Sequence, residues 1–149
     1  MGIAIEAAVA AEAIGEVPIG ACVIGGDGKL LAVASNRTIT DNDPTAHAEV
    51  LALRAAAIRV GNYRLLETTL YSTVEPCVMC AGALVNARVS RLVYGTPDER
   101  YGGVVTKFQL CDSAVLNHRL EILGGVRGEE CKVLMLDFFR VRRRSAFIP

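Results

Sequence analysis

The chain has 149 residues, is 52% hydrophobic and 21% charged, and carries a formal net charge of zero. These values exclude a disordered chain and a uniformly basic surface, and the length fits one domain over residues 1–149. The charge is nevertheless uneven, because residues 1–50 hold two basic and seven acidic side chains, whereas residues 101–149 hold eight basic and five acidic ones. A basic patch near the C-terminus is therefore compatible with the neutral total.

The first quarter of the sequence predicts a helix followed by a β-hairpin. Residues 3–14 are rich in alanine and favour a helix. The glycine cluster at residues 25–28 is a turn signal between apolar runs at residues 17–24 and 29–34. Two apolar runs around such a turn indicate an antiparallel hairpin.

The rest of the sequence alternates helices with short apolar strands. Asp43 or Thr45 is placed to cap a helix over residues 46–60, because a side-chain oxygen at that position accepts a hydrogen bond from a free backbone N–H. Alternation of strands with helices predicts parallel pairing, and the whole pattern predicts an α/β fold with a mixed sheet of about five strands covered by helices. The further elements are expected at residues 70–73, 91–94 and 120–123 for strands and 76–87 and 129–144 for helices.

Cysteine usage and hydropathy bear on the compartment. Five cysteines with a single close pair do not indicate a disulfide framework. Residues 1–13 have no positive n-region and contain acids, so we expect no signal peptide, and the absence of a run of about 18 apolar residues predicts no contact with a membrane. The expected compartment is a reducing cytoplasm, where cysteines at short spacing are more often metal ligands or redox groups.

Two segments carry residues suited to metal chemistry, Thr-Ala-His-Ala-Glu at 45–49 and Glu-Pro-Cys-Val-Met-Cys at 75–80. His47, Cys77 and Cys80 offer one imidazole and two thiolates, a donor set that suits Zn²⁺. Three protein ligands leave a fourth position for water, which is typical of a catalytic zinc site. The Cys-x-x-Cys spacing is also found in thiol exchange, but the His-x-Glu segment favours the metal.

The spacing of these residues predicts where the metal would lie. Cys77 and Cys80 share one side of a helix at its start, where the partial positive charge favours thiolates. His47 and Glu49 are two residues apart and do not share a helix side, so a common centre must lie beyond the amino end of their helix. We therefore expect two helix N-termini to converge on one metal ion. Glu49 is then the candidate proton carrier between a metal-activated water and the substrate.

The combination of H-x-E with P-C-x-x-C is the signature of the zinc deaminases, and the chain resembles the cytidine deaminase superfamily. Residues 15–21, 35–37, 62–65, 117–119 and 137–143 extend this resemblance, over nearly the whole chain, to the bacterial tRNA-specific adenosine deaminases. The resemblance implies a three-layer α/β/α cytidine-deaminase-like fold and a homodimer with one Zn²⁺ per chain. It also implies hydrolytic deamination of the wobble adenosine of a tRNA anticodon to inosine, with release of ammonia.

The resemblance further implies which residues contact the substrate. Asn36 matches a residue that contacts the target nucleoside, and Asp98 matches a loop acid near the neighbouring nucleotide. Asn117 and Phe139 match positions that line the anticodon pocket. Residues 95–116 depart most from the family pattern, with Arg-Tyr-Gly-Gly in place of a more usual lysine-containing run.

The arginine cluster near the C-terminus suits an RNA loop, because splayed bases are held by stacking and by contacts to phosphates. We expect Arg140 and Arg142 to supply such contacts, more than Arg143 and Arg144. Phe138 and its neighbour Phe139 point in different directions on a helix, so at least one of them is expected in the core.

Two alternatives remain open from the sequence. A deaminase of free guanine, cytosine or a nucleotide would share the zinc motifs but would not need the arginine cluster. A zinc-bearing RNA-binding module without activity would not need a carboxylate at Glu49, whose presence therefore favours an enzyme.

Overall fold

The computed structural model describes the backbone of residues 1–145 and the side chains of residues 1–143. Its elements along the chain are α1 (Gly2–Ala13), β1 (Gly20–Ile24), β2 (Leu30–Ser35), α2 (Ala48–Val60), β3 (Thr69–Val74), α3 (Val78–Asn86), β4 (Arg91–Thr96), β5 (Glu121–Leu123) and α4 (Gly128–Ser145). Every helix and strand expected from the sequence is present, with its ends shifted by at most three residues.

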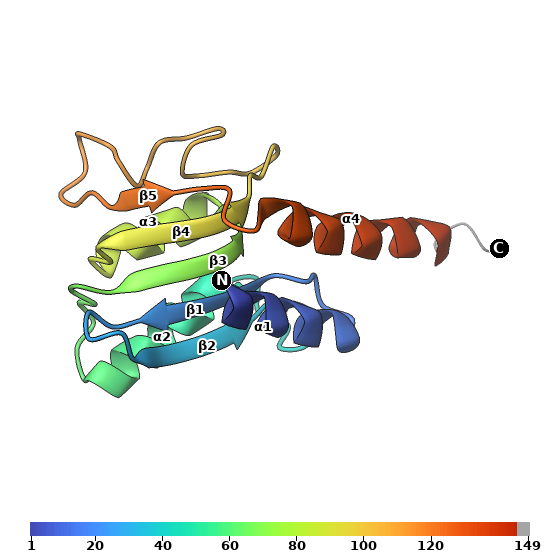
Figure 1. Cartoon of the computed structure of the whole chain (residues 1–149), viewed down its shortest axis with the longest axis horizontal. Helices are drawn as coiled ribbons and strands as arrows, with labels where there is room; N and C mark the ends of the chain where they lie inside the picture. The colour runs from blue at the N-terminus through green and yellow to red at the C-terminus, as the bar shows by residue number, and fades with distance from the viewer. Residues whose placement is uncertain (146–149) are drawn as a thin grey trace.

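The five strands form one mixed sheet in the order β2-β1-β3-β4-β5 (Figure 1). Strand β1 pairs antiparallel with β2 and with β3, whereas β4 runs parallel to both β3 and β5. The expected hairpin and the expected parallel pairing in the second half are therefore both confirmed. The central strand β3 ends at the motif that begins with Glu75, which places that motif in the middle of the sheet edge.

Helices cover both faces of the sheet, with α2 and α3 on one face and α1 and α4 on the other (Figure 1). The three-layer α/β/α arrangement expected from the resemblance is thus present. Small residues allow α1 to lie close to the sheet, because Ala4, Ala8 and Ala11 are fully buried against it. A side chain at Gly20 would place its Cβ 2.0 Å from the carbonyl oxygen of Ala4, so only glycine fits in β1 at this point.

Helix α4 runs farther past the end of the sheet than any other helix (Figure 1). Cys131 and Phe138 are buried on it, but Val133, Leu136 and Val141 are more than half exposed. The helix therefore has only a narrow buried side. No helix within residues 1–145 has the length and apolar character needed to cross a membrane.

Candidate metal centre and substrate pocket

The first residues of two helices bring the predicted ligands together. His47 directly precedes α2, Cys77 directly precedes α3, and Cys80 lies in the first turn of α3. The Nδ1 atom of His47 is 3.7 Å from Sγ of Cys77 and 3.5 Å from Sγ of Cys80. All three donor atoms lie within 4.8 Å of one another, so the expected convergence of two helix N-termini on one point is present.

Neither of these two helices has a side-chain cap among the described residues. Asp43 instead accepts hydrogen bonds from the backbone N–H and the hydroxyl of Thr45 at 2.8 and 2.7 Å. The expectation that one of these two residues caps α2 was therefore wrong, because they satisfy each other in a turn before the helix. The uncapped N-termini leave their partial positive charge directed at the thiols.

The hydrogen bonds within the cluster shift the pKa values of its members. A bond from Cys80 lowers the pKa of Cys77 to about 4 against the opposing effect of burial, and His47 lowers it further. The same shared bond, together with burial, raises the pKa of Cys80. A hydrogen bond to Cys77 raises the pKa of His47. A thiolate, a thiol and an imidazole at these distances fit a Zn²⁺ site, since binding such an ion displaces the ligand protons.

Glu49 lies beside the cluster and is only 3% exposed. One carboxyl oxygen is 3.6 Å from Sγ of Cys80, and the other accepts a hydrogen bond from the hydroxyl of Ser72 at 3.2 Å. Burial raises the pKa of Glu49 above its ordinary value. A carboxyl group that is dry, close to the metal position and raised in pKa is suited to receiving and releasing a proton. Ser72 was not foreseen, since it is one of several small polar residues in a strand.

The cluster opens onto a cavity of about 500 Å³ lined by Asn36, His47, Glu49, Val78 and Phe108 among others. Asn36 is only 4% exposed, and its Nδ2 atom donates a hydrogen bond to the hydroxyl oxygen of Thr38 at 3.3 Å. The Oδ1 atom of Asn36 is buried without a hydrogen-bond partner in the part of the chain that the structure describes. An unpaired buried acceptor in a cavity wall indicates a position where a ligand supplies the donor.

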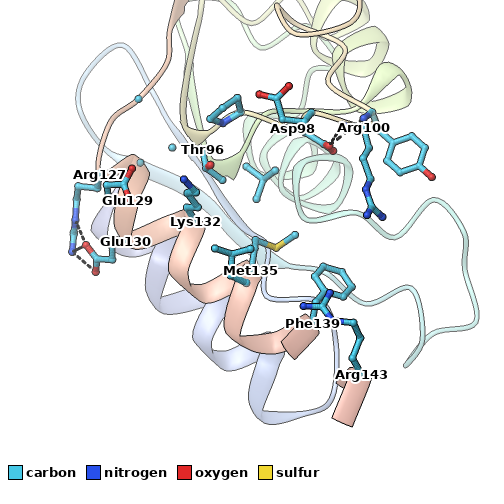
Figure 2. Close-up of a pocket in the computed structure, with 18 residues that line it drawn as sticks. Thr96, Asp98, Arg100, Arg127, Glu129, Glu130, Lys132, Met135, Phe139 and Arg143 are labelled. Atoms are coloured by element: carbon cyan, nitrogen blue, oxygen red, sulfur yellow. Dashed lines mark hydrogen bonds and ion pairs between the residues drawn. The ribbon is translucent and has the colours of Figure 1, made fainter. Parts of the chain in front are cut away.

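A second cavity of about 1000 Å³ adjoins the first, and Figure 2 shows it between the loop after β4 and helix α4. Phe139 and Arg143 lie at one end of it, and Arg127 with its ion-pair partner Glu130 lies at the other. The two cavities share wall residues, namely Val74, Asp98, Arg100, Tyr101 and Met135. The two cavities therefore lie next to each other between the metal position and α4.

Two of three predicted substrate contacts, Asp98 and Phe139, border these cavities, and the third, Asn117, does not. Asp98 borders both cavities, and its carboxylate accepts hydrogen bonds from the backbone N–H groups of Arg100 and Tyr101 at 2.9 and 3.1 Å. Phe139 is 41% exposed and lines the larger cavity. Its ring packs edge to face against Phe138, and Phe138 is the buried member of this pair. Asn117 lines neither cavity within residues 1–145.

The side chain and carbonyl of Asn117 are held instead by Arg88, at 3.0 and 2.7 Å. The structure therefore does not bring Asn117 to the metal position. Its expected contact with RNA stays a prediction.

The two arginines expected to contact RNA are both engaged by the protein. Arg140 pairs with Asp137 one turn earlier at 2.9 Å, on the exposed side of α4. Arg142 donates a hydrogen bond to the carbonyl oxygen of Gly15 at 2.5 Å and lies over the ring of Phe138. Neither lines either of these two cavities. Arg143 does so, and the side chain of Arg144 lies outside the described residues.

Glu75 is a structurally important residue that was quoted in the motif but given no role. It is buried and accepts backbone hydrogen bonds from Asp98, Val105 and Thr106 at 3.1, 2.8 and 2.9 Å. Burial alone would raise the pKa of Glu75, but the hydrogen bonds from Thr106, Val105 and Asp98 outweigh it and lower the pKa. Its carboxylate therefore ties the 97–106 loop, and with it the shared cavity wall, to the end of β3. The signal available in the sequence was an acid at the end of a buried strand.

The remaining histidine and cysteines lie apart from the cluster. His118 is partly buried and is hydrogen-bonded to the carbonyl of Val89 at 2.7 Å. Cys22, Cys111 and Cys131 are buried in the core, and burial raises the pKa of each thiol. Within the described residues the metal-type cluster is therefore a three-ligand one.

The fold and this site together define a deaminase whose His/Cys/Cys cluster is consistent with zinc. The MafB19-like deaminase family matches residues 1–143. The tRNA-specific adenosine deaminase of Haemophilus influenzae is 45% identical to this chain, over 97% of it and 84% of the relative. The chain therefore belongs to the deaminase family and, within it, to the tRNA-specific adenosine deaminases.

Solved structures agree with this assignment. A structure from work on A-to-I editing by tRNA:A34 deaminases at the wobble position superposes with a TM-score of 0.86 and 37% identity, over 90% of this chain and 96% of the other. The guanine deaminase of Bacillus subtilis is 40% identical but covers only 63% of this chain and 60% of its own, with a TM-score of 0.61. The cytidine-deaminase-like fold expected from the resemblance is confirmed.

Proposed function

We propose that this protein converts adenosine to inosine at the wobble position of a tRNA anticodon, with water as co-substrate and ammonia as product. The carrying observation is the convergence of His47, Cys77 and Cys80 beside the buried Glu49, in a chain whose family members are named for this substrate. The intact Glu49 favours an enzyme over a zinc-bearing binding module, because holding the metal does not require that carboxyl group.

In this proposal His47, Cys77 and Cys80 hold one Zn²⁺ per chain. When bound there, the ion lowers the pKa of a water molecule so that it can act as a nucleophile near neutral pH. Glu49 takes a proton from the attacking water and delivers it to N1 of the adenine ring. It then carries the second proton to N6, as the C6–N6 bond breaks and ammonia leaves. Ser72 holds the carboxyl group in place during both transfers.

In this proposal the two cavities bind different nucleotides of the RNA. The smaller cavity takes the target adenosine against Asn36, and the larger one takes neighbouring nucleotides between the loop after β4 and α4. Phe139 offers a partly exposed ring for stacking, and Arg143 offers a positive charge for a phosphate. Asp98 and Asn117 remain proposed RNA contacts from the family resemblance, and Arg140 remains one from the arginine cluster near the C-terminus. Arg142 is proposed to brace α4 against the carbonyl of Gly15.

We further propose that residues 1–149 act as a single deaminase domain in a cytoplasmic homodimer. Exposed apolar side chains line the smaller cavity, with Val78 46% and Phe108 52% exposed. An apolar rim beside a site supports a second copy packing there. Light scattering coupled to size exclusion would measure the expected dimer mass, and a monomer at micromolar concentration would contradict it.

The function is tested by incubating the protein with an anticodon stem-loop, free adenosine and free guanine in separate reactions. We expect ammonia release from the stem-loop alone and inosine at the wobble position when the product is mapped. Turnover of free guanine without turnover of the stem-loop would instead support a small-substrate deaminase. Tight stem-loop binding with zinc present and no ammonia would support a binding module.

A further inference from the structure

The starting observation is a chain of buried polar contacts that leads away from the substrate cavity. Asn36 lines that cavity, and its Nδ2 atom donates to the hydroxyl oxygen of Thr38 at 3.3 Å. The hydroxyl of Thr38 donates in turn to Glu16 at 3.4 Å. Glu16 is fully buried and also accepts a hydrogen bond from the backbone N–H of Thr40 at 2.6 Å.

Glu16 is a charged acceptor fixed by the fold. Its backbone N–H bonds to the carbonyl of Ala11 at 3.0 Å, which anchors it to the end of α1. Burial would raise the pKa of Glu16, but hydrogen bonds from Thr40, Ile39 and Thr38 outweigh it and lower the pKa. The group is therefore a carboxylate at neutral pH and can only accept hydrogen bonds.

This charge determines how the amide of Asn36 is turned. The hydroxyl of Thr38 has one hydrogen, which it donates in a hydrogen bond to the Glu16 carboxylate. Only lone pairs of that oxygen then face Asn36, so the amide must present its NH₂ group to Thr38. Its carbonyl oxygen Oδ1 is thereby left unpaired in the described structure.

The backbone around Asn36 is held as firmly as its side chain. The N–H of Asn36 bonds to the carbonyl of Ile19 at 3.0 Å, and the N–H of Arg37 bonds to the carbonyl of Ala46 at 2.9 Å. Ala46 directly precedes His47, so this tie relates the position of Asn36 to the metal cluster.

We propose that Glu16 is a positioning residue which, through Thr38, holds Asn36 as a hydrogen-bond acceptor for the target nucleoside. The inference rests on the proposed function, and it adds a residue outside the cavity that sets the polarity of the cavity wall. The group recognised is a hydrogen-bond donor on the nucleoside, either the exocyclic amine or a ribose hydroxyl. A ligand that offers only acceptors at this point leaves two acceptors facing each other and is rejected.

The test is a double-mutant cycle on the stem-loop reaction. In Glu16→Gln the new side chain still accepts a hydrogen bond from Thr40 but places an NH₂ group against Thr38. The hydroxyl of Thr38 then accepts from this NH₂ group and donates its hydrogen toward Asn36. The Asn36 amide therefore rotates so that Oδ1 faces Thr38 and the NH₂ group faces the cavity. We expect kcat/KM to fall by about tenfold to a hundredfold, as for Asn36→Ala. The double variant should be no slower than Asn36→Ala alone, because both changes remove the same contact.

Variants of Thr38 separate this role from a general effect on folding. Thr38→Val keeps Glu16 but removes the hydroxyl, and should lose as much activity as Glu16→Gln, whereas Thr38→Ser should restore nearly the wild-type rate. Glu6→Gln is the matched control, since Glu6 is an exposed acid on α1, and its kcat/KM should be unchanged. Additive losses in the cycle, or wild-type activity in Thr38→Val, would overturn the proposal.

A second readout needs no substrate and no activity. In NMR spectra of the wild-type protein and of Thr38→Ser, the side-chain NH₂ of Asn36 should exchange slowly with solvent. It should exchange fast in Glu16→Gln and Thr38→Val. Fast exchange in the wild type would refute the orienting role of Glu16 and Thr38 even if the enzyme deaminates tRNA. Slow exchange with no turnover of tRNA would support that orienting role and count against the proposed function alone.

Discussion

The metal centre and the outer cavity beside α4 are built in opposite ways. The centre consists of buried or half-buried groups at two helix N-termini, and its residues come from two segments of five and six residues. The outer cavity combines the end of β3, the loop after β4 and α4, and its lining residues lie up to 69 positions apart, from Val74 to Arg143. One region is largely buried and encoded by two short motifs, whereas the other depends on how distant segments pack.

This difference separates chemistry from recognition. Bond breaking requires fixed donor atoms and a dry carboxyl group, which buried helix starts supply. Recognition of an RNA loop requires a wide surface with stacking and mobile positive charges, which an exposed helix supplies. Mutations in the first region should therefore abolish turnover, and mutations in the second should change affinity.

The largest effect is expected at Glu49. Glu49→Gln should lower kcat by about a thousandfold, because the amide cannot take a proton from water, while zinc content stays the same. Ammonia release and metal analysis of the same sample measure the two quantities. Glu67→Gln, at an exposed position, is the matched control and should leave both unchanged. Full activity of Glu49→Gln would contradict the assignment of Glu49 as the proton carrier.

Loss of a ligand should be nearly as severe but should act through the metal. Cys80→Ala should reduce bound zinc from about one ion per chain to a small fraction, since only His47 and Cys77 remain. Cys22→Ala serves as the control, because Cys22 is equally buried but lies in β1 away from the cluster. It should keep its zinc and lose only about 1 kcal/mol of stability from the smaller side chain. Equal zinc content in both variants would contradict the assignment of ligands.

A smaller effect is expected on α4, where two neighbouring arginines should behave differently. Arg143→Ala should weaken stem-loop binding about three- to tenfold and reduce the slope of affinity against salt by about one, as expected for one lost phosphate contact. Arg142→Ala should instead lower the Tm, because Arg142 is bonded to Gly15 and stacked on Phe138. Arg59→Ala on α2 is the control for the loss of one positive charge. If Arg142→Ala loses affinity with an unchanged Tm, the two roles are reversed.

The smallest effect is a pH dependence of stability. The pKa of Glu16 is lowered in the folded protein from an ordinary value of 4.5. The carboxylate therefore stabilises the fold at pH values above about 4.5, and this contribution is lost as the pH falls through the lower folded value. Urea unfolding of wild type and Glu16→Gln should show a difference in free energy at pH 7 that shrinks toward pH 3. A constant difference across this range would show that the charge of Glu16 does not matter.

The fold and the metal cluster were largely predictable from the sequence, since both depend on local patterns. Apolar runs and glycine turns gave the strands, and two motifs with fixed spacing gave the three ligands and Glu49. The anchoring carboxylates Glu16 and Glu75 were missed, because their partners are backbone amides more than twenty positions away. Residue type cannot reveal such partners.

The exposed residues were the hardest to place. Arg142 is of a residue type that suits an RNA contact, but in the folded protein its side chain donates a hydrogen bond to the backbone carbonyl of Gly15. Asn117 matches a pocket position by resemblance, but Arg88 holds it away from both cavities within the described residues.

A single peptide unit, between Gly15 and Glu16, takes part in contacts both to α4 and to the wall of the substrate cavity. The carbonyl of its first residue is the point where Arg142 fastens the overhanging part of α4 to the N-terminal helix. The side chain of its second residue orients Asn36 through Thr38. One contact that positions α4 and the contacts that orient Asn36 therefore meet at a single peptide unit.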